Sequence, residues 1–176
     1  NMGLDIAQVF AVKGHDVVVR DISDELIQKG EERLKASLAR QVEKGRRTQA
    51  EADAISAKIV FTTNMRQAAD ADLIVEAIVE NVSIKKDLFR QLDTIVKPEA
   101  IFATNTSSFS PTELASATKR ADRFIGMHFF NPATVMKLIE VIRGANTSQE
   151  TFTTVYELAE SLGKEPIEVA EAPGFV

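Results

Sequence analysis

The stretch DLIVEAIVENVSIKKDLFRQLDTIVKPEAIFAT, residues 72–104, decides the fold class of this chain. It predicts a strand at 72–77, a helix at 82–96 that ends before Pro98, and a second strand at 100–104. Both predicted strands are continuous apolar runs, which is typical of strands that are buried on both faces of a parallel sheet. A helix between two such strands indicates an α/β fold.

The same alternation extends in both directions along the chain. Ser23 is placed to cap a helix that runs to about Lys44, and Thr48-x-x-Glu51 is a capping-box pattern for a short helix. The other predicted elements are a helix at 3–13, strands at 17–20 and 59–62, a helix from Ser110, strands at 123–130 and 136–143, a helix opened by Thr147-x-x-Glu150, and a strand at 166–170. We therefore expect a doubly wound, mostly parallel sheet that is covered on both faces.

The composition excludes several classes of protein. The chain has 176 residues, enough for one well-cored domain, and no apolar run approaches the roughly 20 residues of a membrane span. Its formal net charge is −5 and it has no long basic run, which argues against a nucleic-acid-binding protein. It has no cysteine and only two histidines, so we expect neither a disulfide nor a metal site.

Polar residues collect where the predicted strands end. They are Asp21, Glu76 with Glu80, Asn105 to Ser107, and His128 with Asn131. Ligands of open α/β sheets bind at the carboxyl ends of the strands, and helix amino termini at that edge favour anions. The sequence therefore predicts a ligand site at this edge.

His128 and Glu140 form the candidate catalytic pair. His128 lies near the end of one predicted strand and Glu140 interrupts the apolar run of the next, with a Pro-containing turn between the two strands. If the strands pair, a carboxylate beside the imidazole fixes its tautomer and increases its basicity, as a general base requires. Spacing alone leaves open the alternative of a half-buried His beside an edge-strand Glu.

Asp21 is a candidate ligand for a nucleotide ribose. It ends a predicted strand and follows Gly3 at close to the spacing, roughly 20 residues, at which an acidic residue follows the glycine-rich turn of a dinucleotide-binding fold. Such a carboxylate accepts hydrogen bonds from ribose hydroxyls and repels a 2′-phosphate, so it favours NAD over NADP, although Arg20 lies beside it. The alternative is an Asp that only forms a turn.

Four motifs in the same order resemble the NAD-binding domain of 3-hydroxyacyl-CoA dehydrogenases, including the 3-hydroxybutyryl-CoA type. They are VEAIVEN at 75–81, FATNTSS at 102–108, HFFNP at 128–132 with MKLIEV at 136–141, and APGFV at 172–176. The resemblance runs through essentially the whole chain and implies a Rossmann-like fold. It also implies NAD-dependent oxidation of a 3-hydroxyacyl-CoA, or the reverse reaction, on short-chain substrates of fatty-acid or butyrate metabolism.

The resemblance also implies a role for each matching residue. The implied catalytic residues are His128, Glu140, Ser107 and Asn131. The implied cofactor contacts are Met2, Gly3, Asp21, Glu80 and Lys85, together with Ser107 and Asn131. Ser37 and Lys44 match positions that contact the CoA moiety.

Some of these residues have plainer explanations. Ser107 and Ser108 could close a loop, and Lys44 could be a solvated helix residue. Lys85 could be a surface lysine that pairs with Asp87 or Glu80.

The family pattern also gives expectations about the extent of the domain. We expect a nucleotide-binding domain at 1–171 that lacks its first strand and two glycines of the glycine-rich turn, with 172–176 leading to a helical domain that is absent here. In the family that helical domain completes the site and forms a homodimer, so this chain alone would be an incomplete enzyme.

Three functions compete. The first is a separate dehydrogenase, the second is the same domain inside a multifunctional fatty-acid oxidation protein, and the third is a non-catalytic nucleotide-binding relative. Asn131 favours the first, because the multifunctional proteins commonly carry Ser at that position, and retention of His128 with Glu140 argues against the third. We expect a protein of the bacterial cytoplasm rather than of mitochondria or peroxisomes.

Overall fold

Residues 2–171 are described by a computed structural model, in which the chain divides into two compact units, Asn1–Gln67 and Ala68–Val176. The APGFV motif lies outside the described residues. Each unit has its own sheet, and each is described by itself.

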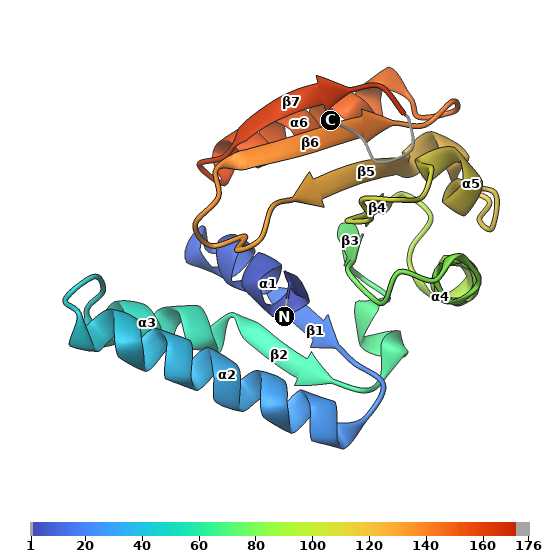
Figure 1. The fold of residues 1–176 in the computed structure, drawn as a ribbon. Helices are drawn as coiled ribbons and strands as arrows, with labels where there is room; N and C mark the ends of the chain where they lie inside the picture. The colour runs from blue at the N-terminus through green and yellow to red at the C-terminus, as the bar shows by residue number, and fades with distance from the viewer. Residues whose placement is uncertain (1, 172–176) are drawn as a thin grey trace. The chain divides into compact units, whose positions relative to one another are not determined.

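The first unit is built around a two-stranded parallel sheet (Figure 1). Its elements are α1 (Met2–Val12), β1 (Val17–Arg20), α2 (Asp24–Glu43), α3 (Gln49–Ala57), β2 (Ile59–Thr62) and the 3-10 helix η1 (Met65–Ala68), which leads into the second unit. Helix α2 runs alongside both α3 and β2. All three α-helices contribute to one apolar core, which includes Leu4, Leu34, Leu38 and Ile55.

Helix boundaries in the first unit follow the predicted signals. The Ser23 hydroxyl accepts a hydrogen bond from the Leu26 amide at 3.3 Å, which caps α2. Thr48 and Glu51 form the reciprocal capping box, with bonds of 3.1 and 2.8 Å. Gly14 ends α1 with φ +89°, a left-handed conformation that other residues rarely adopt. These predictions are confirmed.

The second unit holds a five-stranded sheet in the order β3-β4-β5-β6-β7. Strands β3, β4 and β5 are parallel, β6 is antiparallel to β5, and β7 is parallel to β6. The elements are β3 (Leu73–Glu76), α4 (Val82–Ile95), β4 (Ile101–Thr104), α5 (Pro111–Ala115), η2 (Ala121–Arg123), β5 (Phe124–Phe129), β6 (Leu138–Arg143), α6 (Gln149–Ser161) and β7 (Glu165–Val169).

Aromatic rings fix α4 against this sheet. Phe89 of α4 packs on Phe102 of β4 and Phe124 of β5, with ring centroids 5.7 and 4.7 Å apart, and none of the three is more than 1% exposed. This packing places the first turn of α4 beside the carboxyl end of β3, where the candidate site lies.

The predicted α/β class with a mostly parallel, Rossmann-like sheet is confirmed. Within residues 2–171 the strands pair as two sheets, one in each unit.

The predicted start of the last helix is wrong by one residue. Ser148, not Thr147, caps α6, because the Ser148 hydroxyl accepts a hydrogen bond from the Thr151 amide at 3.1 Å. Thr147 instead donates its hydroxyl to the Phe124 carbonyl at 2.6 Å and accepts from the Gly144 amide at 2.9 Å. A tertiary contact therefore selects between two neighbouring residues that are both good caps.

Candidate active site

His128 and Glu140 face each other across β5 and β6. The antiparallel register makes them direct partners, and His128 Nδ1 lies 2.8 Å from Glu140 Oε1. The His128 side chain is 15% exposed and that of Glu140 is 1% exposed. The predicted juxtaposition is confirmed, and the edge-strand alternative for Glu140 is wrong because β6 lies between β5 and β7.

The second carboxylate oxygen of Glu140 has no hydrogen-bond partner among residues 2–171. The Glu140 side chain is 1% exposed, so this oxygen is also shielded from solvent. An unpaired buried polar group costs about 1–3 kcal/mol, and such groups in folded proteins often mark functional positions. Glu140 therefore holds one paired and one unpaired oxygen in a buried position.

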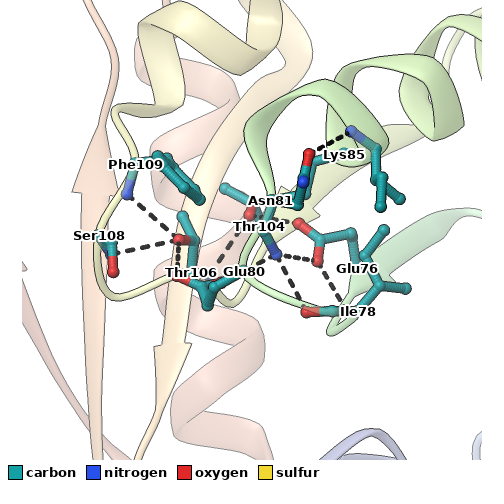
Figure 2. Close-up of polar contacts among 10 residues, drawn as sticks. Glu76, Ile78, Glu80, Asn81, Lys85, Thr104, Thr106, Ser108 and Phe109 are labelled. Carbon is teal, nitrogen blue, oxygen red and sulfur yellow. Dashed lines mark hydrogen bonds and ion pairs between the residues drawn. The ribbon is translucent and has the colours of Figure 1, made fainter.

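A second buried charge cluster lies where β3 ends and α4 begins (Figure 2). Lys85, in the first turn of α4, is 1% exposed, and its Nζ lies 2.5 Å from Oε2 of Glu76, the last residue of β3. Nζ also donates to Glu80 Oε1 at 3.0 Å and to the Ile78 carbonyl at 3.3 Å. The alternative of a surface lysine is therefore wrong about its exposure, whereas the pairing with Glu80 that it included is confirmed.

Both oxygens of Glu76 are occupied. Oε1 accepts a hydrogen bond from the Thr104 hydroxyl at 2.7 Å, and Oε2 accepts from the Ile78 amide at 2.8 Å in addition to the lysine. These donors satisfy both oxygens of a carboxylate that is only 2% exposed.

Glu80 connects this cluster to the loop after β4. Its Oε2 accepts a hydrogen bond from the Thr106 hydroxyl at 2.8 Å, and its side chain is 44% exposed. Burial by itself would raise the pKa of Glu80, but the hydrogen bonds from Thr106 and Lys85 outweigh it and lower that pKa. Glu80 therefore presents an ionised carboxylate at the surface of the site.

Thr106, rather than either serine, closes the loop after β4. Its hydroxyl oxygen accepts hydrogen bonds from the Ser108 and Phe109 amides, each at 3.2 Å. Ser107 lies exposed in this loop. The loop-closing explanation for Ser107 is thus unnecessary, because Thr106 performs that task.

Asn105 links the loop after β4 to the end of β5. Its side-chain oxygen accepts a hydrogen bond from the Phe129 amide at 2.7 Å. Phe129 directly follows His128, and Asn131 lies exposed just beyond it. The second unit thus brings the neighbourhoods of Ser107, His128 and Asn131 to adjacent strand ends.

The first unit carries the other predicted site residues. Met2 and Gly3 open α1 and are partly exposed. Asp21 directly follows β1, and its Oδ1 accepts a hydrogen bond from the Ile22 amide at 2.8 Å. This local bond is typical of a turn-forming Asp and occupies one carboxylate oxygen, so both explanations of Asp21 are compatible with it.

Ser37 and Lys44 lie on α2 and at its carboxyl end. The Ser37 hydroxyl donates to Gln8 Oε1 at 3.5 Å and accepts from Gln41 Nε2 at 3.2 Å. Lys44 is the exposed C-cap residue of α2.

Sequence reasoning noticed Glu76 and Thr106 only as polar residues at strand ends and did not identify Thr104. The available signal was a carboxylate that ends an apolar strand and is followed by polar residues at the end of the next strand. The pairing of Lys85 with Glu76 could not be predicted from the sequence, because it depends on where α4 lies against the sheet.

Within residues 2–171, no group of three His, Cys, Asp or Glu side chains is placed to hold a metal ion. In the same part of the chain, none of the helices combines the length and the apolar character that crossing a membrane requires.

Comparison with known families agrees with this geometry. Residues 1–172 match the family described as "3-hydroxyacyl-CoA dehydrogenase, NAD binding domain". The fold and the strand-end residues thus define a nucleotide-binding domain of the dehydrogenase class. The chain belongs to the 3-hydroxyacyl-CoA dehydrogenase family.

Individual relatives are closely similar. The chain is 52% identical to a probable 3-hydroxybutyryl-CoA dehydrogenase of Deinococcus radiodurans and 49% identical to a 3-hydroxybutyryl-CoA dehydrogenase of Clostridioides difficile, with 99% of this chain covered in both. A crystal structure of (S)-3-hydroxybutyryl-CoA dehydrogenase from Ralstonia eutropha matches 99% of the chain with a TM-score of 0.96 and 47% identity. The chain spans 63%, 62% and 62% of the lengths of these three proteins.

Proposed function

We propose that this chain is the NAD-binding domain of an enzyme that oxidises a 3-hydroxyacyl-CoA to the 3-oxoacyl-CoA, or catalyses the reverse reaction. The observation that carries the proposal is the direct cross-strand pairing of His128 with a buried Glu140 at 2.8 Å. The relatives named 3-hydroxybutyryl-CoA dehydrogenase support a short-chain substrate, such as 3-hydroxybutyryl-CoA or acetoacetyl-CoA.

His128 is the general base of the proposed reaction. Because Nδ1 faces an ionised carboxylate, which only accepts hydrogen bonds, Nδ1 carries the ring hydrogen and Nε2 is the basic nitrogen. Nε2 takes the proton of the substrate hydroxyl as the hydride leaves C3. NAD, when bound, accepts that hydride at its nicotinamide ring. In the reverse direction the imidazolium returns the proton to the oxygen.

Glu140 orients the imidazole and stabilises its protonated form. Within residues 2–171 no lysine or arginine forms an ion pair with Glu140, so protonation of His128 creates a new ion pair in a buried setting. This arrangement lowers the free energy of the state in which the substrate proton has been transferred.

Ser107 and Asn131 hold the reacting groups. Both are exposed and follow neighbouring strands, β4 and β5. Ser107 donates a hydrogen bond to the reacting oxygen, and Asn131 binds near the nicotinamide end.

The remaining cofactor contacts divide between the two units. Asp21, with Met2 and Gly3, serves the adenosine side, where its carboxylate accepts from ribose hydroxyls and repels a 2′-phosphate. Arg20, beside Asp21, donates its Nε to the Thr63 carbonyl at 3.1 Å. In the second unit, Glu80 and Lys85 serve the nicotinamide side.

Ser37 and Lys44 contact the CoA moiety, since an exposed ammonium suits its phosphates. We also propose a homodimer of the complete protein and a location in the bacterial cytoplasm. The dimer rests on the family resemblance alone, and the location is supported by the bacterial origin of the relatives compared above.

The test is oxidation of NADH by the complete protein with acetoacetyl-CoA, run beside NADPH. Rapid turnover with NADH is expected. A preference for NADPH would keep the reaction class and reject the role of Asp21. Absence of turnover with both cofactors would reject the proposed substrate class and favour a non-catalytic nucleotide-binding protein.

A further inference from the structure

Five side chains around Glu76 form a closed ring of hydrogen bonds and ion pairs, called the Glu76 ring below (Figure 2). Glu76 accepts from Lys85 and from Thr104, the Thr104 hydroxyl accepts from the Thr106 amide at 3.3 Å, Thr106 donates to Glu80, and Glu80 accepts from Lys85. Each member of the ring thus bonds two others.

The Glu76 ring joins two loops that carry proposed cofactor contacts. The loop 77–81 connects β3 to α4 and carries Glu80, and the loop 105–109 follows β4 and carries Ser107. Glu76 itself is 2% exposed, so a ligand contacts the loops and not the carboxylate. Its Oε2 holds the first loop through the Ile78 amide, and its Oε1 holds the second through Thr104.

The charges in the ring leave a net negative charge on its exposed member. Two carboxylates surround one ammonium, and all three N–H donors of Lys85 have acceptors, which are Glu76, Glu80 and the Ile78 carbonyl. Glu76 is deeply buried, whereas Glu80 is 44% exposed. Because a carboxylate has about four acceptor positions, Glu80 keeps acceptor capacity for ligand hydroxyls.

We propose that Glu76 is a positioning residue for NAD binding. It neutralises Lys85 and, through Thr104 and Thr106, fixes Glu80 and the loop 105–109 in the arrangement that binds the cofactor. Without Glu76, Lys85 draws Glu80 inward as its only remaining carboxylate. The inference rests on the proposed function, which assigns Glu80 and Ser107 to the cofactor.

A purely structural role would give a different result, and the chain offers a matched control for it. Asp93, near the other end of α4, pairs with Arg120 at 2.7 Å, and their side chains are 12% and 6% exposed. Arg120 also donates to the Val96 and Ala100 carbonyls, so this pair holds backbone together as the Glu76 ring does. Neither residue has a proposed contact with the cofactor.

The experiment compares Glu76→Gln and Asp93→Asn in the complete protein. NADH affinity is measured by fluorescence titration, and the thermal unfolding midpoint is measured on the same samples. We expect Glu76→Gln to raise the NADH dissociation constant by roughly 10- to 100-fold, the range seen when an outer partner of a binding residue is removed. Asp93→Asn should lower the midpoint and leave the NADH dissociation constant unchanged.

A second pair of variants separates positioning from stability. Adding Lys85→Met to Glu76→Gln removes the unneutralised cation, so the midpoint should partly recover. NADH affinity should stay low in the double variant, because the loops are still not fixed and the proposed contact of Lys85 with the cofactor is also lost. Recovery of wild-type affinity together with the midpoint would overturn the inference.

Two further outcomes would also overturn it. One is wild-type NADH affinity in folded Glu76→Gln, and the other is equal weakening of NADH binding by Glu76→Gln and Asp93→Asn. If Glu76→Gln does not fold, Thr104→Val decides, because it breaks the ring at one hydroxyl. Unchanged NADH affinity in Thr104→Val would then reject the inference.

The NADH titration needs no turnover, so the proposed reaction and the proposed role of Glu76 can be rejected independently of each other. A wild-type protein that binds NADH without reducing acetoacetyl-CoA would reject the proposed substrate and leave the comparison of Glu76→Gln with Asp93→Asn valid.

Discussion

Two buried glutamates in one sheet have opposite surroundings. Glu76 at the end of β3 is 2% exposed and Glu140 in β6 is 1% exposed. Glu76 accepts hydrogen bonds at both oxygens, from Thr104 at one and from Lys85 at the other. Glu140 has His128 at one oxygen and no partner within residues 2–171 at the other.

Under the two proposals, the difference separates a carboxylate that positions cofactor-binding loops from one that assists proton transfer. The partner of Glu76 is a permanent cation, so its charge is balanced at all times. The partner of Glu140 is an imidazole, which is charged only when it has taken a proton. The ion pair of Glu140 with His128 therefore forms only during the proposed reaction, whereas the ion pair of Glu76 with Lys85 is present before it.

Removal of the imidazole gives the largest expected effect. In His128→Ala no group takes the hydroxyl proton, so kcat should fall by about 10²–10⁴-fold, the usual contribution of a general base. NADH affinity should stay close to that of the wild type, because the Glu76 ring is intact. Steady-state kinetics and NADH titration measure the two quantities, and a wild-type kcat would remove His128 from the mechanism.

Removal of the charge of Glu76 should give the largest loss of stability. Breaking a buried ion pair costs about 3–5 kcal/mol, and Glu76→Gln should lie near the lower end because Glu80 still pairs with Lys85. The matched surface variant is Asp72→Asn, whose partner is Lys97 and whose side chain is 92% exposed. That change should leave the free energy of unfolding nearly unchanged. If urea unfolding showed equal losses of unfolding free energy in Glu76→Gln and Asp72→Asn, the expected difference between the buried and the surface ion pair would be contradicted.

A methyl group between β5 and β6 should disturb the Glu140 site alone. A Cβ on Gly126 would lie 2.9 Å from the Ile142 Cβ, so Gly126→Ala should cost about 1–3 kcal/mol through overpacking and lower kcat by moving the two strands apart. Gly14→Ala is the control, because its Cβ meets no atom within 4 Å and only its φ of +89° is strained. It should be less stable with a wild-type kcat. Loss of kcat in both would point to general destabilisation.

Glu171 provides a third, partly exposed carboxylate and the smallest expected effect. Burial alone would raise its pKa, but hydrogen bonds from Ser110 and Thr112 outweigh burial and lower the pKa below 4.5. A pKa lowered in the folded state stabilises the protein above pH 4.5, and this contribution is lost as pH falls through the lowered value.

Glu171→Gln should therefore be less stable than the wild type at neutral pH and lose less stability below pH 4.5. Urea unfolding on both sides of that pH measures the difference. Parallel pH profiles in the two proteins would show that Glu171 makes no such contribution.

The two glutamates also show what the sequence could predict. His128 and Glu140 lie on consecutive strands with a short connection, so strand pairing alone places them together. The α/β class could also be predicted from the sequence, because apolar runs and helix caps such as Ser23 are local signals.

The Glu76 ring could not be predicted from the sequence. Lys85 lies on a helix with several charged residues, and its burial depends on how Phe89 seats α4 against β4 and β5. Likewise, Thr106 rather than Ser107 closes its loop because Glu80 lies within reach of its hydroxyl. In both cases tertiary packing determines which of several residues with similar local sequence signals takes the buried or loop-closing position.

The most direct test of the contrast is kcat and NADH affinity measured together for Glu140→Gln and Glu76→Gln in the complete protein. We expect a large loss of kcat with unchanged NADH affinity in Glu140→Gln. We expect weakened NADH affinity in Glu76→Gln, with kcat at saturating NADH less affected than in Glu140→Gln. The same pattern of loss in both variants would contradict the claim that the two buried carboxylates have different tasks.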